Sequence, residues 1–276
     1  MQLISFSDLS AFSSAVTPFL MEREAVNNLM LGLLDAGQNA APADWEMTAV
    51  VEGGEPVLAA LRTPPHNLIL AGETVSEEAI ALLSAHYSGK PLPGVIGPSV
   101  LAEAFAARYA AEAGVSWKVT IAETVYQLTV VSNVPQPGRL RPAKERDGFF
   151  LAYWLRSSEE EIFHRSAPLN FEDARERSLN GELFLYEVEG VPVCLVGTSR
   201  QMPHGRSIGP VYTPPIFRRK GYATAATAAL SRWILADGND YCALFADRAN
   251  PASNRAYQKA GFQPVGEFSE IGFCAE

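Results

Sequence analysis

The chain has 276 residues, of which 47% are hydrophobic and 19% charged, and its formal net charge is −9. This composition is ordinary for a folded globular protein and excludes a disordered or fibrous chain, while the length suits two domains of moderate size. Residues 1–135 hold 14 Asp/Glu against five Lys/Arg, which disfavours nucleic acid as a partner because neutralising phosphates requires clustered cations.

Three cysteines, Cys194, Cys242 and Cys274, lie far apart and follow no metal-binding spacing, so we expect no metal site. Cys194 and Cys242 lie in apolar runs, which favours reduced core residues in a cytoplasmic protein. The N-terminal segment lacks the basic start of a signal peptide, and no apolar run approaches the roughly 20 residues that span a bilayer. We therefore expect a cytoplasmic protein without a membrane partner. Nothing in the sequence indicates an oligomeric state.

The first half of the chain contains a predicted hairpin at residues 50–61, with a Glu-Gly-Gly turn between two strands. Residues 92–114 combine a strand that contains Gly-Pro with an alanine-rich helix. Residues 131–143 hold three prolines and a glycine, and the charge balance changes there. This pattern predicts a linker at 131–138 between domains at 1–130 and 139–276.

The second half alternates strands and helices. We expect a strand at 139–143, a helix at 147–157 whose inward face carries Phe149, Phe150, Tyr153 and Trp154, and a helix at 171–179. Three strands (183–189, 191–201 and 207–213), a helix (221–235), a strand (241–247), a short helix from Pro251 and strands near 262–273 follow. This order predicts a mixed α/β sheet that is covered by helices.

The two halves resemble each other. The hairpin at 186–197 repeats the V-E-G and P-V steps of the hairpin at 50–61, with the same spacing to within one residue. Residues 207–233 then repeat the Gly-Pro strand and alanine-rich helix of 92–114, which indicates a tandem duplication. In this pairing Ser99 and Val100 stand where the second copy has a cationic turn. We therefore expect the second copy to carry the chemistry and the first only the scaffold.

That cationic turn consists of Arg218, Arg219 and Lys220, directly before Gly221 and the start of a helix. The first N–H groups of a helix have no partner within the helix, and with the helix dipole they form an anion site. Glycine lets an anion approach the main chain closely. Cations at this end oppose the dipole by about 0.3–1 kcal/mol each unless an anion is bound. The turn therefore predicts a phosphate site, and a solvated basic turn is the alternative.

A second motif occupies residues 246–262. Asn250 is a suitable N-cap, Pro251 a suitable first helical residue, and Gly261 a suitable end of the helix. Asn254 and Tyr257 are three residues apart and therefore lie on one face of this short helix. So short a helix is barely stable alone, so we expect it to pack against the sheet.

The two motifs, V-Y-T-P-P-x-x-R-x-K-G-Y-A at 211–223 and N-P-x-S-N-x-x-Y-x-x-x-G-F at 250–262, resemble the GNAT superfamily of N-acetyltransferases. The resemblance implies the GNAT fold, with a largely antiparallel central sheet, here in two tandem copies of which the N-terminal one is degenerate. It also implies acetyl-CoA as the cofactor and the amine of a small molecule or peptide as the acceptor.

The resemblance further implies roles for single residues. The strand at 211–213 pairs with the pantetheine arm, the turn at 218–223 holds the pyrophosphate on main-chain N–H groups, Asn254 bonds the pantetheine, and Tyr257 protonates the departing sulfur. For Tyr257, a core aromatic is the alternative. The predicted cofactor-binding residues are Val211, Tyr212, Thr213, Arg218, Arg219, Lys220, Gly221, Tyr222, Ala223, Thr224, Asn250, Asn254 and Tyr257.

The general base is not assigned. Many GNAT members use a glutamate on the strand that contacts the pantetheine, and Ser207 occupies that position here. His204 and Glu182 are nearby in the sequence, and a surface or turn role is the alternative for both. The missing acid favours a rival hypothesis, in which the chain is a non-catalytic sensor that binds acyl-CoA.

Overall fold

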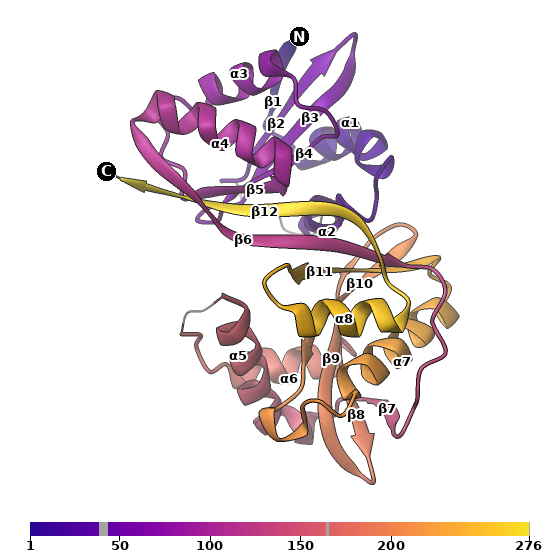
Figure 1. Ribbon diagram of the computed structural model, residues 1–276. Coiled ribbons are helices and arrows are strands. Elements are labelled where there is room, and N and C mark those ends of the chain that lie inside the picture. The colour runs from indigo at the N-terminus through magenta and orange to yellow at the C-terminus, as the bar shows by residue number, and fades with distance from the viewer. Residues whose placement is uncertain (39–43, 164–165, 276) are drawn as a thin grey trace. The chain divides into compact units, whose positions relative to one another are not determined.

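The computed structural model describes residues 1–38, 44–163 and 166–275 (Figure 1). The chain forms two compact units, one of Met1–Val125 with Val265–Glu276 and one of Tyr126–Pro264. Within the described ranges, no helix is long and apolar enough to cross a membrane.

The elements follow each other in the same order twice. The first series is β1 (Gln2–Phe6), α1 (Leu9–Met21), α2 (Asn28–Gly37), β2 (Glu46–Glu52), β3 (Glu55–Arg62), β4 (Leu68–Ala71), α3 (Glu77–His86), β5 (Gly94–Pro98), α4 (Ser99–Ala113) and β6 (Val115–Leu128). The second is β7 (Arg139–Pro142), α5 (Gly148–Phe163), α6 (Phe171–Leu179), β8 (Leu183–Val188), β9 (Val191–Gln201), β10 (Gly205–Tyr212), α7 (Tyr222–Ala236), β11 (Tyr241–Asp247), α8 (Pro251–Ala260) and β12 (Gln263–Ala275). The repeated order confirms the predicted tandem copies.

Each unit has a mixed, largely antiparallel sheet, as predicted. In the first unit β1 to β5 lie in sequence order and all pairs are antiparallel except β4 with β5, while β12 pairs antiparallel with β5. In the second unit β7 to β11 lie in sequence order and all pairs are antiparallel except β10 with β11.

The element order corrects our pairing of the two copies. Residues 92–114 form β5 and α4, which correspond to β11 and α8, whereas β10 and α7 correspond to β4 and α3. The sequence pairing was therefore shifted by one strand and one helix. It was misled because residues 92–114 and residues 207–233 both contain a strand with Gly-Pro that is followed by an alanine-rich helix. The counterpart of the cationic turn therefore precedes α3, where Ser76 caps the helix and Glu77 and Glu78 fill its first turn. Carboxylates at this end of a helix disfavour a bound anion.

The unit boundaries also differ from the predicted domains at 1–130 and 139–276. Residues 265–276 belong to the first unit, because β12 pairs with β5 there. Residues 126–138 belong to the second unit, whose core includes Tyr126 and Leu128 from the end of β6. The hydrophobic pattern of a sequence predicts where a strand lies along the chain. It does not predict which sheet the strand joins, because the possible partner strands are distant in the sequence.

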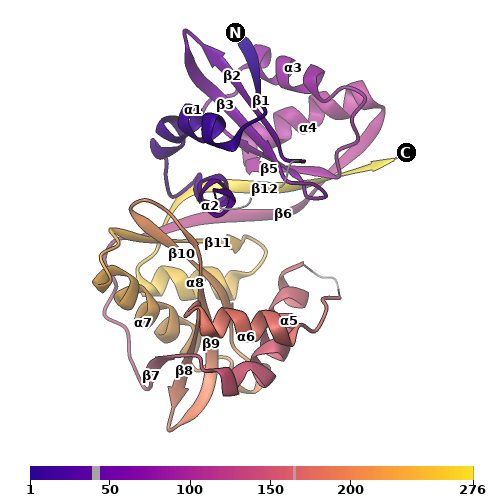
Figure 2. The ribbon, with the colours of Figure 1, turned by 180° about the vertical axis from the view of Figure 1, so that it is seen from behind.

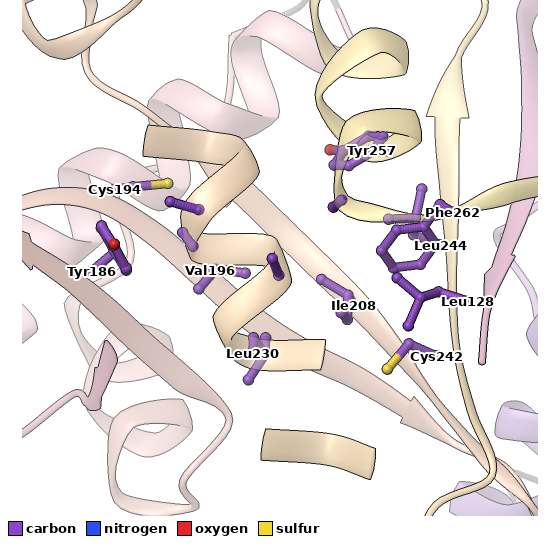
Figure 3. Packing of buried hydrophobic residues seen from close by; sticks show 14 of the residues in the cluster. Leu128, Tyr186, Cys194, Val196, Ile208, Leu230, Cys242, Leu244, Tyr257 and Phe262 are labelled. Carbon is purple, nitrogen blue, oxygen red and sulfur yellow. The ribbon is translucent and has the colours of Figure 1, made fainter. Parts of the chain in front are cut away.

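Helices cover both faces of the second sheet. On one face, side chains of β8, β9, β10 and β11 pack against α7 and α8, and Figure 3 shows this cluster. On the other face, the alternate residues Leu183, Leu185 and Leu195 pack against α5 and α6. Figures 1 and 2, which view the unit from opposite sides, show α8 in front of the strands in one view and α6 in the other.

The inward face predicted for the helix at 147–157 is only partly correct. Phe150 and Trp154 pack against the core, but Phe149 is 77% exposed and Tyr153 is 50% exposed. The last two contact Phe171 of α6 on the outside, with ring centroids 5.1 and 6.0 Å away. Four aromatics within six positions exceed one face of a helix, so packing decides which of them are buried.

A buried ion-pair network fastens the start of the second unit. Arg141 of β7 lies 2.6 Å from Asp147 and 2.6 Å from Glu187 of β8, and both carboxylates are nearly inaccessible to solvent. Burial raises the pKa of Asp147, but its hydrogen bonds with Arg141 and Lys144 outweigh burial and leave this pKa below its usual value. The hydrogen bond from Arg141 likewise lowers the pKa of Glu187.

Candidate functional site

The site begins where β10 and β11 separate. Their parallel ladder runs from Gly205 to Ser207 on β10, and over the described chain it ends there, although β10 continues to Tyr212 and β11 to Asp247. The later part of β10 pairs with β9 on its other edge, with an irregular register between Ile208 and Val211. The edge of β10 beyond Ser207 therefore offers main-chain groups to an extended ligand, which binds by adding a strand.

The side chains of the three predicted binding residues at 211–213 differ in their exposure to solvent. Val211 and Thr213 are half-buried, while the Tyr212 side chain is 7% exposed and belongs to the core cluster on the α5 face. The Tyr212 ring lies 6.2 Å from that of Trp154. Tyr212 therefore has only main-chain groups to offer a ligand.

The turn that follows β10 has the backbone of an anion site. Gly221 is the N-cap of α7, its φ is 81°, and no side chain caps the helix. A Cβ atom placed on Gly221 would meet nothing within 4 Å, so the space beside this glycine is open. Side chains cap α1, α3, α6 and α8, whereas α2 and α4, like α7, have no side-chain cap within the described chain; among these three, α7 follows a cationic turn. An uncapped helix start without acidic residues fits a diphosphate, which would accept hydrogen bonds from these amides.

The three cations of the turn are not equivalent. The Arg218 Nε donates to the Thr213 carbonyl oxygen at 2.8 Å, and its guanidinium pairs with Glu161 of α5 at 2.6 Å. Arg219, with a φ of 64°, and Lys220 are exposed, and neither has an ion pair with the residues that the structure describes. The Arg218 side chain thus fastens the turn to the protein, and the next two side chains supply uncommitted positive charge.

The residues that open α7 and α8 take the predicted positions. Tyr222, Ala223 and Thr224 form the first turn of α7 and are half-buried. Asn250 caps α8 by accepting a hydrogen bond from the Ser253 N–H at 3.1 Å, so its side chain serves the helix.

The side-chain amide of Asn254 is held by three protein groups. Its Nδ2 donates to the carbonyl oxygens of Asp247 and Asn250, both at 2.7 Å, and its Oδ1 accepts from the Tyr126 hydroxyl at 2.9 Å. Both donors of the amide are therefore occupied within the chain, and its oxygen uses one of its two lone pairs on Tyr126. Sequence reasoning missed Tyr126, which lies 128 residues away and has no local signal.

Tyr257 is buried on α8, with 8% of its surface exposed. Its ring lies 6.4 Å from that of Tyr126 and 6.2 Å from that of Phe262, and its hydroxyl points toward the side on which Cys194 lies (Figure 3). Burial raises the pKa of Tyr257 well above its usual value, because the phenolate would be poorly solvated, and the proximity of Cys194 adds to this. The hydroxyl therefore keeps its proton at neutral pH.

Cys194 and Cys242 are buried free thiols, as predicted. The Thr213 hydroxyl donates to the Cys194 sulfur at 3.3 Å, which ties the end of β10 to β9. Burial nevertheless raises the pKa of the Cys194 thiol to about 12. Cys194 is thus a neutral packing residue.

Ser207, which replaces the usual acid, lies where β10 and β11 separate, whereas the two base candidates, His204 and Glu182, do not. Ser207 occupies the last paired position, is fully buried and accepts from Arg200 at 3.4 Å. His204 directly precedes β10 and so lies at its opposite end. Glu182 precedes β8, which runs in the same direction as β10, and it pairs with Arg177 at 3.2 Å. Asp247 ends β11 on the open side, where its Oδ1 accepts from the Ala249 N–H at 2.8 Å and so caps the loop.

Residues 148–262 match the family described as the acetyltransferase (GNAT) family. They form a GNAT domain. The match lies within the second unit and includes the turn at Gly221 and the helix with Tyr257. It supports acetyl transfer as the general reaction of the GNAT domain.

Solved structures share the fold over the whole chain. A GCN5-related N-acetyltransferase from Sphaerobacter thermophilus aligns with a TM-score of 0.60 at 16% identity, covering 98% of this chain and 95% of that one. A GNAT-family acetyltransferase from Colwellia psychrerythraea aligns with a TM-score of 0.58 at 14% identity over 100% of both chains. A tandem GNAT protein from the clavulanic acid biosynthesis pathway aligns with a TM-score of 0.53 at 13% identity, covering 99% and 98%. No curated protein matches the chain.

Proposed function

We propose that this protein is an acetyl-CoA-dependent N-acetyltransferase, in which the primary amine of a small molecule or peptide attacks the thioester directly. The observation that carries the proposal is the uncapped start of α7 at Gly221, directly after the unpaired edge of β10. One feature suits a diphosphate and the other an extended amide-containing arm, and coenzyme A contains both in that order. The buried free thiols Cys194 and Cys242 fit a reducing compartment, so we also propose the cytoplasm.

The residues of the GNAT domain divide the work of binding. We propose that the amides of Gly221 to Thr224 hold the diphosphate, assisted by the free charges of Arg219 and Lys220. The main chain of Val211 to Thr213 would align the arm of the cofactor. Arg218, Asn250 and Asn254 act on the protein side, because their side chains already bond within the chain.

Tyr257 is the residue that we propose as the general acid. Acetyl-CoA supplies an activated acetyl group whose leaving group is a thiolate. A buried tyrosine that stays protonated can donate a hydrogen bond to this sulfur and stabilise the thiolate as it departs. Because the pKa of a thiol, near roughly 8.5, lies below that of a tyrosine, this hydrogen bond forms before the proton is transferred, and Tyr257 recovers the proton from solvent afterwards. Main-chain N–H groups of β10 would stabilise charge on the carbonyl oxygen.

No side chain is assigned as the base, and this shapes the acceptor that we expect. An alkylamine of pKa near roughly 10 is only about 0.1% neutral at pH 7, which corresponds to about 4 kcal/mol. Ser207 cannot remove this proton, and His204 and Glu182 lie at the closed end of the strand pair. We therefore expect water to take the proton, less basic amines to react faster at pH 7, and kcat/KM to rise with pH up to the pKa of the amine.

The test is thiol release by the purified full chain with acetyl-CoA and a panel of amines of graded pKa. Release that requires protein, acetyl-CoA and amine together is the expected result. Binding of coenzyme A in a calorimeter without turnover across the panel would support the acyl-CoA sensor, which the serine at position 207 favours. Absence of both binding and turnover would refute the proposal.

A further inference from the structure

The helix that carries Tyr257 is held in place by a residue from outside its own part of the sequence. With ten residues, α8 is too short to be stable alone, so its orientation depends on its contacts. Two of its side chains, Asn254 and Gln258, meet the same group, the hydroxyl of Tyr126. These two residues are one helical turn apart and lie on one face of the helix, next to Tyr257.

The hydroxyl of Tyr126 both donates to and accepts from side chains of α8. It donates to the Asn254 Oδ1 at 2.9 Å and accepts from the Gln258 Nε2 at 3.3 Å. Asn254 in turn holds the carbonyl oxygens of Asp247 and Asn250, which joins α8 to the end of β11. The rotation of α8 about its own axis is therefore fixed by hydrogen bonds along the face next to Tyr257.

The Tyr126 ring also packs beside the proposed acid. Tyr126 is 3% exposed, and its ring centroid lies 6.4 Å from that of Tyr257 with the planes tilted by 58°. Tyr126 lies near the end of β6, a strand whose first residues, Val115–Val125, belong to the first unit. The last strand of the first copy thus supplies a side chain to the core of the second unit.

We propose that Tyr126 is a positioning residue for Tyr257, which rests on the proposed acetyltransferase function. Its hydroxyl sets the orientation of α8 and thereby the direction of the Tyr257 hydroxyl, without contacting a substrate. Asn254 acts as the connector between the two.

The variant Tyr126→Phe tests the proposal, because it keeps the ring and removes only the hydroxyl. We expect kcat to fall about tenfold while the Kd of coenzyme A changes less than twofold. The matched control is Tyr186→Phe on β8, another fully buried tyrosine, whose hydroxyl accepts from the Gly138 N–H at 2.9 Å. The control should lower the melting temperature to a similar extent and leave kcat within twofold.

The decisive measurement is the double variant Tyr126→Phe/Tyr257→Phe. If Tyr126 acts through Tyr257, the double variant has the kcat of Tyr257→Phe alone, whereas general damage would multiply the two losses. The exposed Gln258→Ala removes one of the two hydrogen bonds at little risk to folding, and we expect a smaller loss of kcat in the same direction.

Independent effects in the double variant, or an unchanged kcat in both Tyr126→Phe and Gln258→Ala, would overturn the positioning role while leaving the acetyltransferase proposal intact. A wild-type protein without turnover on any amine would overturn both.

Discussion

The variant Gly221→Ala separates the contribution of this glycine to folding stability from its contribution to binding coenzyme A. With φ at 81°, an L-residue at this position is strained by roughly 1–2 kcal/mol, but its Cβ would meet no protein atom within 4 Å. We therefore expect the free energy of unfolding to fall by about that amount and no more. The methyl group projects into the space proposed for the diphosphate, so binding should suffer additionally.

The expected loss of affinity for coenzyme A follows from the hydrogen bonds that the first amides of α7 would donate to its diphosphate. A hydrogen bond to a charged group contributes about 1.5–3 kcal/mol, so losing one such bond raises the Kd of coenzyme A by roughly 10- to 150-fold. Gly221→Asp should weaken binding further, because a carboxylate about 4 Å from a phosphate costs roughly 1–4 kcal/mol more at the effective dielectric of a protein surface or water.

Gly238 provides a matched control at the other end of the same helix. Its φ is 96° and an added Cβ would also meet nothing within 4 Å, so Gly238→Ala should lose similar stability and bind coenzyme A normally. Titration calorimetry for affinity and urea unfolding for stability, on both alanine variants, complete the experiment. Equal affinities in the two variants would show that no diphosphate binds at the start of α7.

Three further predictions concern the second unit. Tyr257→Phe should lower kcat about 100-fold or more with little change in the Kd of coenzyme A, and equal loss of both in steady-state kinetics and calorimetry would make Tyr257 a binding residue. Arg141→Met should cost about 3 kcal/mol in urea unfolding at pH 7, because Asp147 loses its ion pair and Glu187 is left with the exposed Arg139 at 3.4 Å; a cost below about 1 kcal/mol would contradict the network. The stabilisation by these carboxylates is present above their unfolded pKa values near roughly 4 and should disappear as the pH falls through their lowered folded values. The free energy of unfolding should also fall as the pH rises above roughly 8.5, by up to about 1.4 kcal/mol per pH unit for each buried thiol. Burial raises the pKa of Cys194 and Cys242 to about 12 in the folded protein, so the unfolded chain releases the thiol protons at a lower pH. Urea unfolding at pH 8 and 10 tests this, and a Cys194→Ala/Cys242→Ala variant with the same slope would refute it.

Local features of the site could be predicted because their causes are local. The glycine before α7, the asparagine cap of α8 and the left-handed glycine at its end depend on interactions within a few residues, and the structure contains all three. The order of strands and helices followed likewise from hydrophobic period and turn residues, which act over similar distances.

The partners of polar side chains could not be predicted. The sequence suggested that Arg218 and Asn254 face the cofactor, but Arg218 bonds Glu161, 57 residues away, and Asn254 bonds Tyr126, 128 residues away. The sequence also did not predict which side of the helix at 148–163 is buried, or which sheet β12 joins, because both depend on distant partners. The sequence by itself determined where helices start, where they stop and which backbone amides remain uncapped. Only the tertiary structure decided which hydrogen-bond donors of Arg218 and Asn254 are already used within the protein, because a buried polar group bonds whichever partner folding brings within reach.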